Sequence, residues 1–267
     1  MPKLDLTTAK RIKVASGEVS RLKGVGFEWV KPVTDLRAQV IAALYGAGEQ
    51  GAMYDPPDLS TLFQDSAGTT PVTADSQPVG RMLDVSGNGN HATQADAARR
   101  PLYRDIDSLP RVRFDGLDDS LTVPNAINNT DKSFFFGVGH TPDSANEGQI
   151  VAWAGMRFRT RSGSFEFVHR DDNNSPMTVD LGSFTSGQPH VVVMMWDHAA
   201  GDLKWSINGG ATSSLAIAGG RTNATTCAVQ PSALDIFGAA FGPGTKDESQ
   251  LSLLKGWLAS KSGVELS

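Results

Sequence analysis

An Asp/Ser/Asn/Gly loop beginning at residue 84 is the first stretch whose residue types and spacing suit chemistry. The segment D-V-S-G-N-G-N-H matches positions 1, 3, 5 and 6 of an EF-hand calcium loop through Asp84, Ser86, Asn88 and Gly89. Position 12 holds Ala95, where such a loop needs a bidentate Glu. The loop therefore predicts a calcium site that is incomplete on its own.

A second turn, F-D-G-L-D-D-S, carries three carboxylates at Asp115, Asp118 and Asp119. These side chains could supply the oxygens that the first loop lacks, because calcium takes six to eight oxygen ligands. The alternative is that both turns hold themselves together by Asx-type hydrogen bonds to their own backbone, with no ion. Calcium is thus the one candidate cofactor, with Asp84, Ser86, Asn88, Asp115, Asp118 and Asp119 as its candidate ligands.

A glycan-binding face is the second candidate site. The strand-like segment M-R-F-R-T-R directs its arginines to one side, because successive side chains of a strand alternate between faces. Aromatic, basic and acidic groups nearby could complete a sugar site, and the candidate residues are Trp153, Arg157, Arg159, His169, Arg170 and Asp171. The alternative is a solvated sheet face whose tryptophan belongs to the core.

The sequence contains few of the residue patterns that enzymes use for catalysis. Glycoside hydrolysis needs two carboxyl groups flanking the scissile bond, and no E-x-D-x-x-E segment occurs. Glu166 lies between Phe165 and Phe167 and faces away from both, with no acidic partner at a fixed spacing, so a solvated outward position is expected. No histidine lies in an H-x-E or H-E-x-x-H setting, and G-x-S-x-G does not occur. We expect no enzymatic activity.

The elements that must position these residues are short strands. At least nine segments between residues 111 and 239 show period-two alternation, and no helical pattern is interleaved among them. Asn208-Gly209 favours a type I′ hairpin turn. The fold class predicted is mainly β: an antiparallel β-sandwich of jelly-roll, concanavalin A-like type. A helix with Leu251, Leu254 and Leu258 on one stripe closes the chain.

The N-terminal part is organised differently. Residues 1–31 read as a small, basic β module of about three strands, too small to bury a firm core alone. Residues 32–80 read as a helix followed by an extended lead-in that wraps the surface of a body. Residues 81–267 form the jelly roll in this division.

Net charge, cysteine count and the lengths of apolar runs limit the classes of binding partner and the cellular compartment that we expect. A net charge of −5 with mixed signs gives no electrostatic case for nucleic acid or an anionic membrane surface. A single cysteine excludes an intrachain disulfide. The N-terminal segment has no apolar stretch of a secretory signal, and no apolar run is long enough to cross a bilayer. We expect synthesis as a soluble protein in the cytoplasm and no membrane insertion.

Several of these motifs, taken in order, resemble a known family. D-V-S-G-N-G-N-H-A-T-Q, R-P, F-D-G-L-D-D-S-L-T-V, V-V-V-M-M-W-D-H-A-A-G-D-L-K-W-S-I-N-G and the closing L-L-K-G-W-L-A-S-K-S-G-V look like laminin G-like, concanavalin A-like jelly-roll domains. More narrowly, they are similar to the version found in bacteriophage virion and tail proteins. The resemblance covers about residues 38–267.

The resemblance implies a bacteriophage virion protein without enzymatic activity, located in the virion and tail-associated. Residues 1–31 would attach it to other virion proteins, and an outward jelly roll would bind a host surface glycan or a protein. A capsid decoration protein is the alternative, and a polysaccharide depolymerase is the second alternative. Homo-oligomerisation is expected, because virion vertices and tail axes are symmetric.

Overall fold

The computed structural model describes residues 22–24, 27–29, 35–124, 133–142, 148–153, 156–170, 175–217, 226–229 and 233–267. Contacts between residues divide the chain into two units, residues 1–35 and residues 36–267. In the first unit, β1 (Leu22–Gly24) and β2 (Phe27–Trp29) form an antiparallel hairpin with Leu22 opposite Trp29. The other strands expected in this unit lie outside the described residues.

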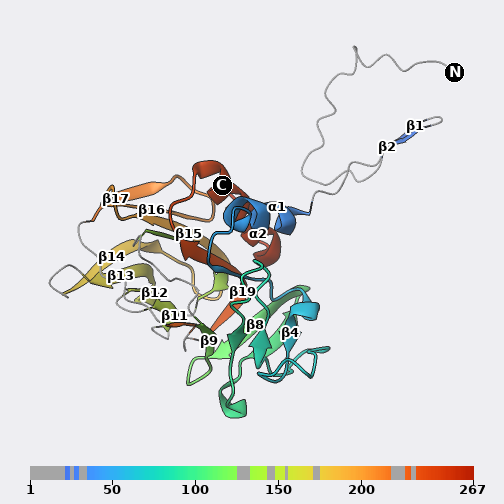
Figure 1. Ribbon diagram of the computed structural model, residues 1–267. Helices are drawn as coiled ribbons and strands as arrows, with labels where there is room; N and C mark the ends of the chain where they lie inside the picture. Colours follow the sequence, from blue (N-terminus) through green and yellow to red (C-terminus); the bar gives the residue numbers. More distant parts are fainter. Residues whose placement is uncertain are drawn as a thin grey trace. The chain divides into compact units, whose positions relative to one another are not determined.

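The second unit contains two antiparallel sheets, which we call sheet I and sheet II (Figure 1). Sheet I has the order β17 (Ser213–Ala216), β16 (Asp202–Ile207), β15 (His190–Asp197), β10 (Phe134–Thr141), β19 (Ala233–Pro243), β8 (Leu109–Asp115) and β7 (Leu102–Ile106), and β3 (Ala52–Tyr54) also pairs with β19. Sheet II has the order β14 (Pro176–Ser183), β13 (Ser164–Arg170), β12 (Met156–Arg161), β11 (Gly148–Trp153), β18 (Thr226–Val229), β9 (Leu121–Pro124), β6 (Ala92–Thr93), β5 (Arg81–Met82) and β4 (Leu62–Phe63). Two short 3-10 helices, Leu59–Thr61 and Ala97–Arg99, lie in the connections.

Alternation along the strands decides which side chains meet between the sheets. In β10, Phe134 and Phe136 face sheet II. The Phe136 ring lies 5.2 Å from that of Phe158 in β12, and the Phe134 ring lies 5.7 Å from that of Phe167 in β13, measured between ring centroids. These aromatic contacts join the two sheets into one sandwich core, as antiparallel sheets with one apolar face require.

The two α-helices of the described chain cover the outer face of sheet I. α1 (Leu36–Tyr45) and α2 (Glu248–Ser262) lie against each other (Figure 1). Their buried apolar side chains pack on that face of sheet I. A capping box between Asp247 and Gln250 begins α2, and Gly263, with a φ of 71°, ends it. The closing helix was predicted from its leucine stripe and is confirmed.

Residues 52–80 belong to the sandwich. β3 pairs with β19 in sheet I, and β4 pairs with β5 in sheet II. Tyr54, Leu62, Val72 and Val79 are at most 2% exposed. The expectation that this segment wraps the surface is wrong in this respect. Its strands are too short to show a period, and β3 pairs with residues nearly 190 positions later in the chain.

The predicted fold class, a mainly β antiparallel sandwich with a C-terminal helix, is confirmed. The predicted hairpin turn is also present: Asn208 and Gly209 have φ values of 50° and 74° and join β16 to the chain leading into β17. No helix in the described ranges has the length and hydropathy of a membrane span.

Candidate functional site

The outer face of sheet II has no helical cover among the described residues. Both α-helices found in the described residues pack on sheet I instead. Met156, Phe158 and Thr160 of β12 are buried and point to the core, so the arginines between them point outward. The predicted common face for Arg157, Arg159 and Arg161 is therefore what the structure shows.

An ion pair lies in the middle of this face. The Arg159 Nη2 atom lies 2.6 Å from Glu166 Oε2, and Arg159 Nε donates to the same oxygen at 2.6 Å. Both side chains are largely shielded, with 19% and 16% of their surface exposed. Gln149 of β11 lies opposite Arg159, and Asp180 of β14 lies opposite Glu166. These four residues form a row of hydrogen-bond donors and acceptors across four strands, which we call the polar row.

The sequence alone does not predict the polar row: Glu166 is expected to be a solvated outward residue with no acidic partner at a fixed spacing, whereas Asp180 lies opposite it. The sequence feature that could have predicted the Arg159–Glu166 pairing is the two-residue turn Ser162-Gly163, whose φ values are 49° and 83°. A two-residue turn sets the register of the strands on either side, and here that register places Arg159 opposite Glu166.

The structure does not bring all the predicted glycan-binding residues together. His169 lies on the same side of β13 as Phe165 and Phe167. It is 1% exposed and stacks on Phe167 with ring centroids 5.6 Å apart. Its expected place beside Arg157 and Arg159 is therefore wrong, because it faces the core. Trp153 and Arg170 lie in β11 and β13, with side chains outside the described part of the structure, and Asp171 lies outside the described residues.

The Asp84 loop ties β3 to sheet II through hydrogen bonds. Asp84 Oδ1 accepts the N–H groups of Met53 and Ser86, both at 2.9 Å, and Oδ2 accepts the N–H of Asn90 at 2.9 Å. The Asn88 amide donates to the carbonyl of Gly51 at 3.3 Å and to Ser86 Oγ at 3.1 Å. Asp84 is 7% exposed. This arrangement is the Asx-type network expected of the ion-free alternative.

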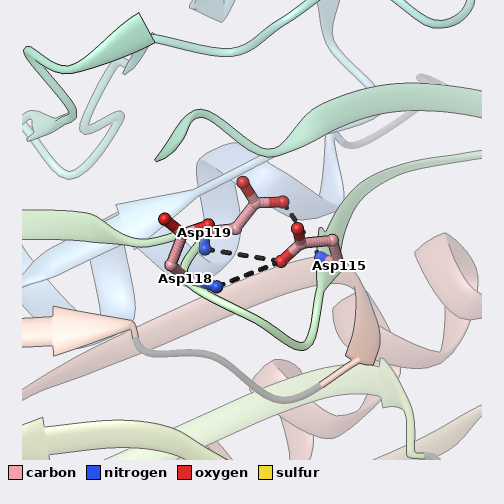
Figure 2. Close-up of side chains that lie close together, drawn as sticks. All are labelled: Asp115, Asp118 and Asp119. Atoms are coloured by element: carbon pink, nitrogen blue, oxygen red, sulfur yellow. Dashed lines mark hydrogen bonds between the residues drawn. The ribbon is translucent and has the colours of Figure 1, made fainter. Parts of the chain in front are cut away.

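The three carboxylates of the second turn do lie together, with oxygens within 4.8 Å of one another (Figure 2). Asp115 Oδ1 accepts the N–H of Leu117 at 2.8 Å, and Asp119 Oδ2 accepts the N–H of Asp115 at 2.9 Å. Burial raises the pKa of the Asp119 carboxyl, and the charges of Asp115 and Asp118 raise it further, against the Asp115 N–H bond that lowers it. Calcium at this turn stays a prediction.

The two turns lie near opposite ends of β19. Asp115 pairs with Ala233, whereas Met53, which bonds to Asp84, pairs with Ala240. Seven residues of an extended strand separate the two positions, a distance of roughly 23 Å. The two turns therefore cannot share one ion, contrary to the expectation that the second completes the first.

Comparison with known proteins adds information on the fold. No family profile matches the sequence, and no curated protein matches it. Among solved structures, the botulinum neurotoxin serotype D binding domain has a TM-score of 0.56 at 13% identity, over 78% of this chain and 52% of that chain. The binding domain of Paraclostridial Mosquitocidal Protein 1 has a TM-score of 0.51 at 13% identity, over 70% of this chain and 51% of that chain.

A solved structure of botulinum neurotoxin type C, whose cell entry depends on interaction with two ganglioside molecules, has a TM-score of 0.56 at 13% identity. It covers 83% of this chain and 53% of that chain. The chain thus spans about half the length of these solved structures. At such low identity the likeness concerns architecture alone, and what is shared is a β-rich, jelly-roll-like sandwich.

Proposed function

We propose that residues 36–267 form a binding domain without enzymatic activity, which recognises a surface glycan or a protein through the outer face of sheet II. The observation that carries the proposal is the contrast between the two outer faces. Sheet I is covered by α1 and α2, whereas sheet II presents the polar row of Gln149, Arg159, Glu166 and Asp180.

The polar row suits a hydroxyl-rich ligand. Arg159 offers planar donors, Glu166 and Asp180 offer acceptors, and Gln149 offers both. Neighbouring strands lie about 4.8 Å apart, so these groups recur at a short and regular spacing. The Arg159–Glu166 pair holds both side chains in one geometry before a ligand arrives, which lowers the entropic cost of binding.

The solved structures with this architecture also favour binding. They include a botulinum neurotoxin receptor-binding domain, a binding domain in complex with rat synaptotagmin II, and botulinum neurotoxin type C, whose cell entry depends on interaction with two ganglioside molecules. For those proteins the ligands are a protein and a glycolipid, the two ligand classes proposed here.

For the whole chain we propose a bacteriophage virion protein, tail-associated, with residues 1–31 attaching it to other virion proteins. The support is the sequence resemblance of residues 38–267 and the separate N-terminal unit of residues 1–35. Homo-oligomerisation follows from the symmetry of virion attachment sites. A capsid decoration protein is the alternative, and co-sedimentation with purified capsids against purified tails separates the two locations. Removal of residues 1–31 is expected to abolish co-sedimentation.

A depolymerase is the second alternative, and one observation bears on it. Glu166 and Asp180 lie directly opposite each other on one sheet face, and directly opposite residues have Cβ atoms about 5 Å apart. Glu166, however, is held by Arg159, which suits recognition better than proton donation. Incubation with host surface polysaccharide is expected to release no reducing ends. Release of reducing ends that Glu166→Gln abolishes would overturn the non-enzymatic proposal.

The binding proposal is tested on immobilised host surface glycans, with and without a calcium chelator. Saturable binding that survives the chelator is expected if the polar row alone recognises the ligand. Binding that the chelator removes would assign a role to calcium at Asp115, Asp118 and Asp119. Failure to bind any host glycan or surface protein under either condition would contradict the proposal.

A further inference from the structure

Arg157 in β12 differs in its contacts from the other arginines of the described chain. It lies on the outer face of sheet II, two residues before Arg159, and its side chain is half-buried. No described residue accepts a hydrogen bond from Arg157, forms an ion pair with it or packs an aromatic ring against it. Every other arginine whose side chain is described has at least one hydrogen bond, ion pair or other interaction. The guanidinium of Arg157 is therefore available to a ligand on this face.

The carboxylates described on the same face are already engaged. Glu166 pairs with Arg159 at 2.6 Å, and Asp180 Oδ1 accepts the N–H of Gly182 at 2.9 Å. The three arginines of β12 and these two carboxylates give the described side chains of β12–β14 a net charge of +1, whereas the whole chain carries −5. A locally positive face on an acidic protein attracts an anion.

The neighbours of Arg157 across the sheet are an apolar side chain and a hydroxyl. Val168 of β13 lies opposite Arg157, and Thr178 of β14 lies opposite Val168. Thr178 is exposed, whereas Val168 is 7% exposed although it points to the outer face like Glu166. This second row lies roughly 7 Å from the polar row, because Arg157 and Arg159 are two residues apart along one strand. A ligand that spans both rows meets a free cation, an apolar spot and several hydrogen-bonding groups.

The chemistry of Arg157 limits the anionic group that it selects. A guanidinium is planar, and its donors match two oxygens of one anionic group. Its single positive charge balances a carboxylate or a sulfate ester, each of which carries a single negative charge, whereas a phosphate monoester carries about −1.5 to −2. The hydroxyl-binding groups of the polar row lie beside Arg157, so the anionic group that fits belongs to a hydroxylated molecule.

We propose that the outer face of sheet II binds an acidic glycan, with a carboxylate or sulfate ester on Arg157 and hydroxyl groups on the polar row. This ligand class rests on the binding function proposed above and is narrower than it. An acidic peptide fits less well, because its further carboxylates would face Glu166 and Asp180. A neutral glycan leaves the Arg157 guanidinium without a charged partner.

The test uses disaccharides that differ only at C6 of the non-reducing sugar. Cellobiose carries a hydroxymethyl group there, cellobiouronate a carboxylate and cellobiose 6′-sulfate a sulfate ester, and lactose with its two acidic counterparts forms a second set. The full-length protein is titrated with each, followed by amide chemical shifts in two-dimensional NMR. In at least one set, an acidic form is expected to shift β12 and β13 saturably and to bind about tenfold more tightly than the neutral form, the factor that a charge-assisted hydrogen bond supplies. The acidic form that binds more tightly identifies the charged group.

Two results would overturn the proposal directly. One is equal affinity of the acidic and neutral forms in both sets, and the other is the absence of saturable binding by any acidic disaccharide. A glutamate hexapeptide is the probe for a protein ligand. Tighter binding of this peptide than of every acidic disaccharide to β12 and β13 would also overturn the proposal, in favour of an acidic protein segment.

Three variants locate the anionic group. Arg157→Gln is expected to lower the affinity for the acidic disaccharide to that for the neutral one, with the neutral affinity and the unfolding midpoint unchanged, because Arg157 bonds to no described residue. Arg159→Gln is expected to weaken both forms, since the polar row then loses its planar donors. Arg104→Gln, in β7 of sheet I, is the matched control and should keep the preference for the acidic form.

The outcomes separate this proposal from the binding function on which it rests. A preference for the acidic form that persists in Arg157→Gln contradicts the role of Arg157. Equal binding of neutral and acidic forms overturns the acidic ligand alone and leaves a glycan-binding face standing. Absence of binding to every disaccharide, to the hexapeptide and to the immobilised host glycans would contradict both proposals.

Discussion

The Arg159 guanidinium and the Glu166 carboxylate meet at 2.6 Å across β12 and β13, on the face of the sandwich that neither described α-helix covers. They are brought opposite each other by the Ser162-Gly163 turn, which begins three residues after Arg159. Because each holds the other in place, a change to either one alters the geometry of the whole polar row.

Arg159→Gln is expected to weaken binding to the immobilised host glycan about tenfold or more, because it removes planar donors and releases Glu166. Stability should change by about 1 kcal/mol or less, since the pair is near the surface. The control is Arg104→Gln, which breaks a similar 3.1 Å pair with Asp75 on sheet I and should leave glycan binding unchanged. Equal glycan affinity in the two variants would place the binding surface elsewhere.

Asp55 joins both helices to the sandwich. It is 1% exposed and pairs with Arg37 of α1 at 3.1 Å and with Lys261 of α2 at 2.8 Å. Asp55→Asn is expected to lower the free energy of unfolding by about 3 kcal/mol, because two cations then lose a buried partner. Urea denaturation measures the loss. Asp202→Asn, which breaks the more exposed pair with Lys204, should cost less than about 1 kcal/mol, and similar losses in both variants would contradict this account.

Gly137 lets α2 approach β10. A Cβ atom there would lie 2.7 Å from Leu254 Cδ2 and 3.1 Å from Leu258 Cδ1. Gly137→Ala is therefore expected to lower the free energy of unfolding by about 1–3 kcal/mol through overpacking. Gly256→Ala, within α2, meets nothing within 4 Å and should raise it by about 0.5–1 kcal/mol. Opposite signs in thermal or urea unfolding are the expected result, and a stabilising Gly137→Ala would show that α2 does not pack here.

His140 predicts a loss of stability in acid. It is fully buried beside the rings of Phe158 and Phe165, and burial, with His190 nearby, lowers the pKa of His140 from 6.5 to about 3. Between pH 6.5 and about 3, the His140 imidazole is protonated in the unfolded chain but neutral in the folded chain. The free energy of unfolding therefore falls as the pH is lowered from 6.5 toward 3, by up to about 1.4 kcal/mol per pH unit.

His140→Leu is expected to reduce this slope by about one proton between pH 6 and 4, as measured by urea unfolding across that range. The control is Val138→Ala, at a fully buried residue of the same strand, which should lower stability by a similar amount at every pH. An unchanged slope in His140→Leu would mean that the His140 ring reaches water in the folded protein.

Local features of the fold could be predicted from the sequence, because neighbouring residues determine them. The Asn208-Gly209 turn needs positive φ at both positions, and the cap at Asp247 and the stop at Gly263 involve groups within one helical turn. The alternation of side chains along β12 also predicts that its arginines face away from its buried residues, as the structure shows. The same alternation puts His169 on the side of Phe165 and Phe167 in β13, so the prediction that His169 belongs to the glycan face is wrong.

Contacts within a few residues fix the strands predicted between residues 111 and 239, the Asn208-Gly209 turn, the closing helix and the mainly β class, so these features are legible in the sequence. The pairing of the strands, and the face that α1 and α2 cover, depend on packing between distant parts of the chain. The tertiary structure places β3 against β19, sets the Asp84 and Asp115 turns at opposite ends of that strand, and puts Asp180 opposite Glu166. These relations join residues far apart in the chain, and residue spacing carries no information on them because long-range strand order is set by packing of the whole core.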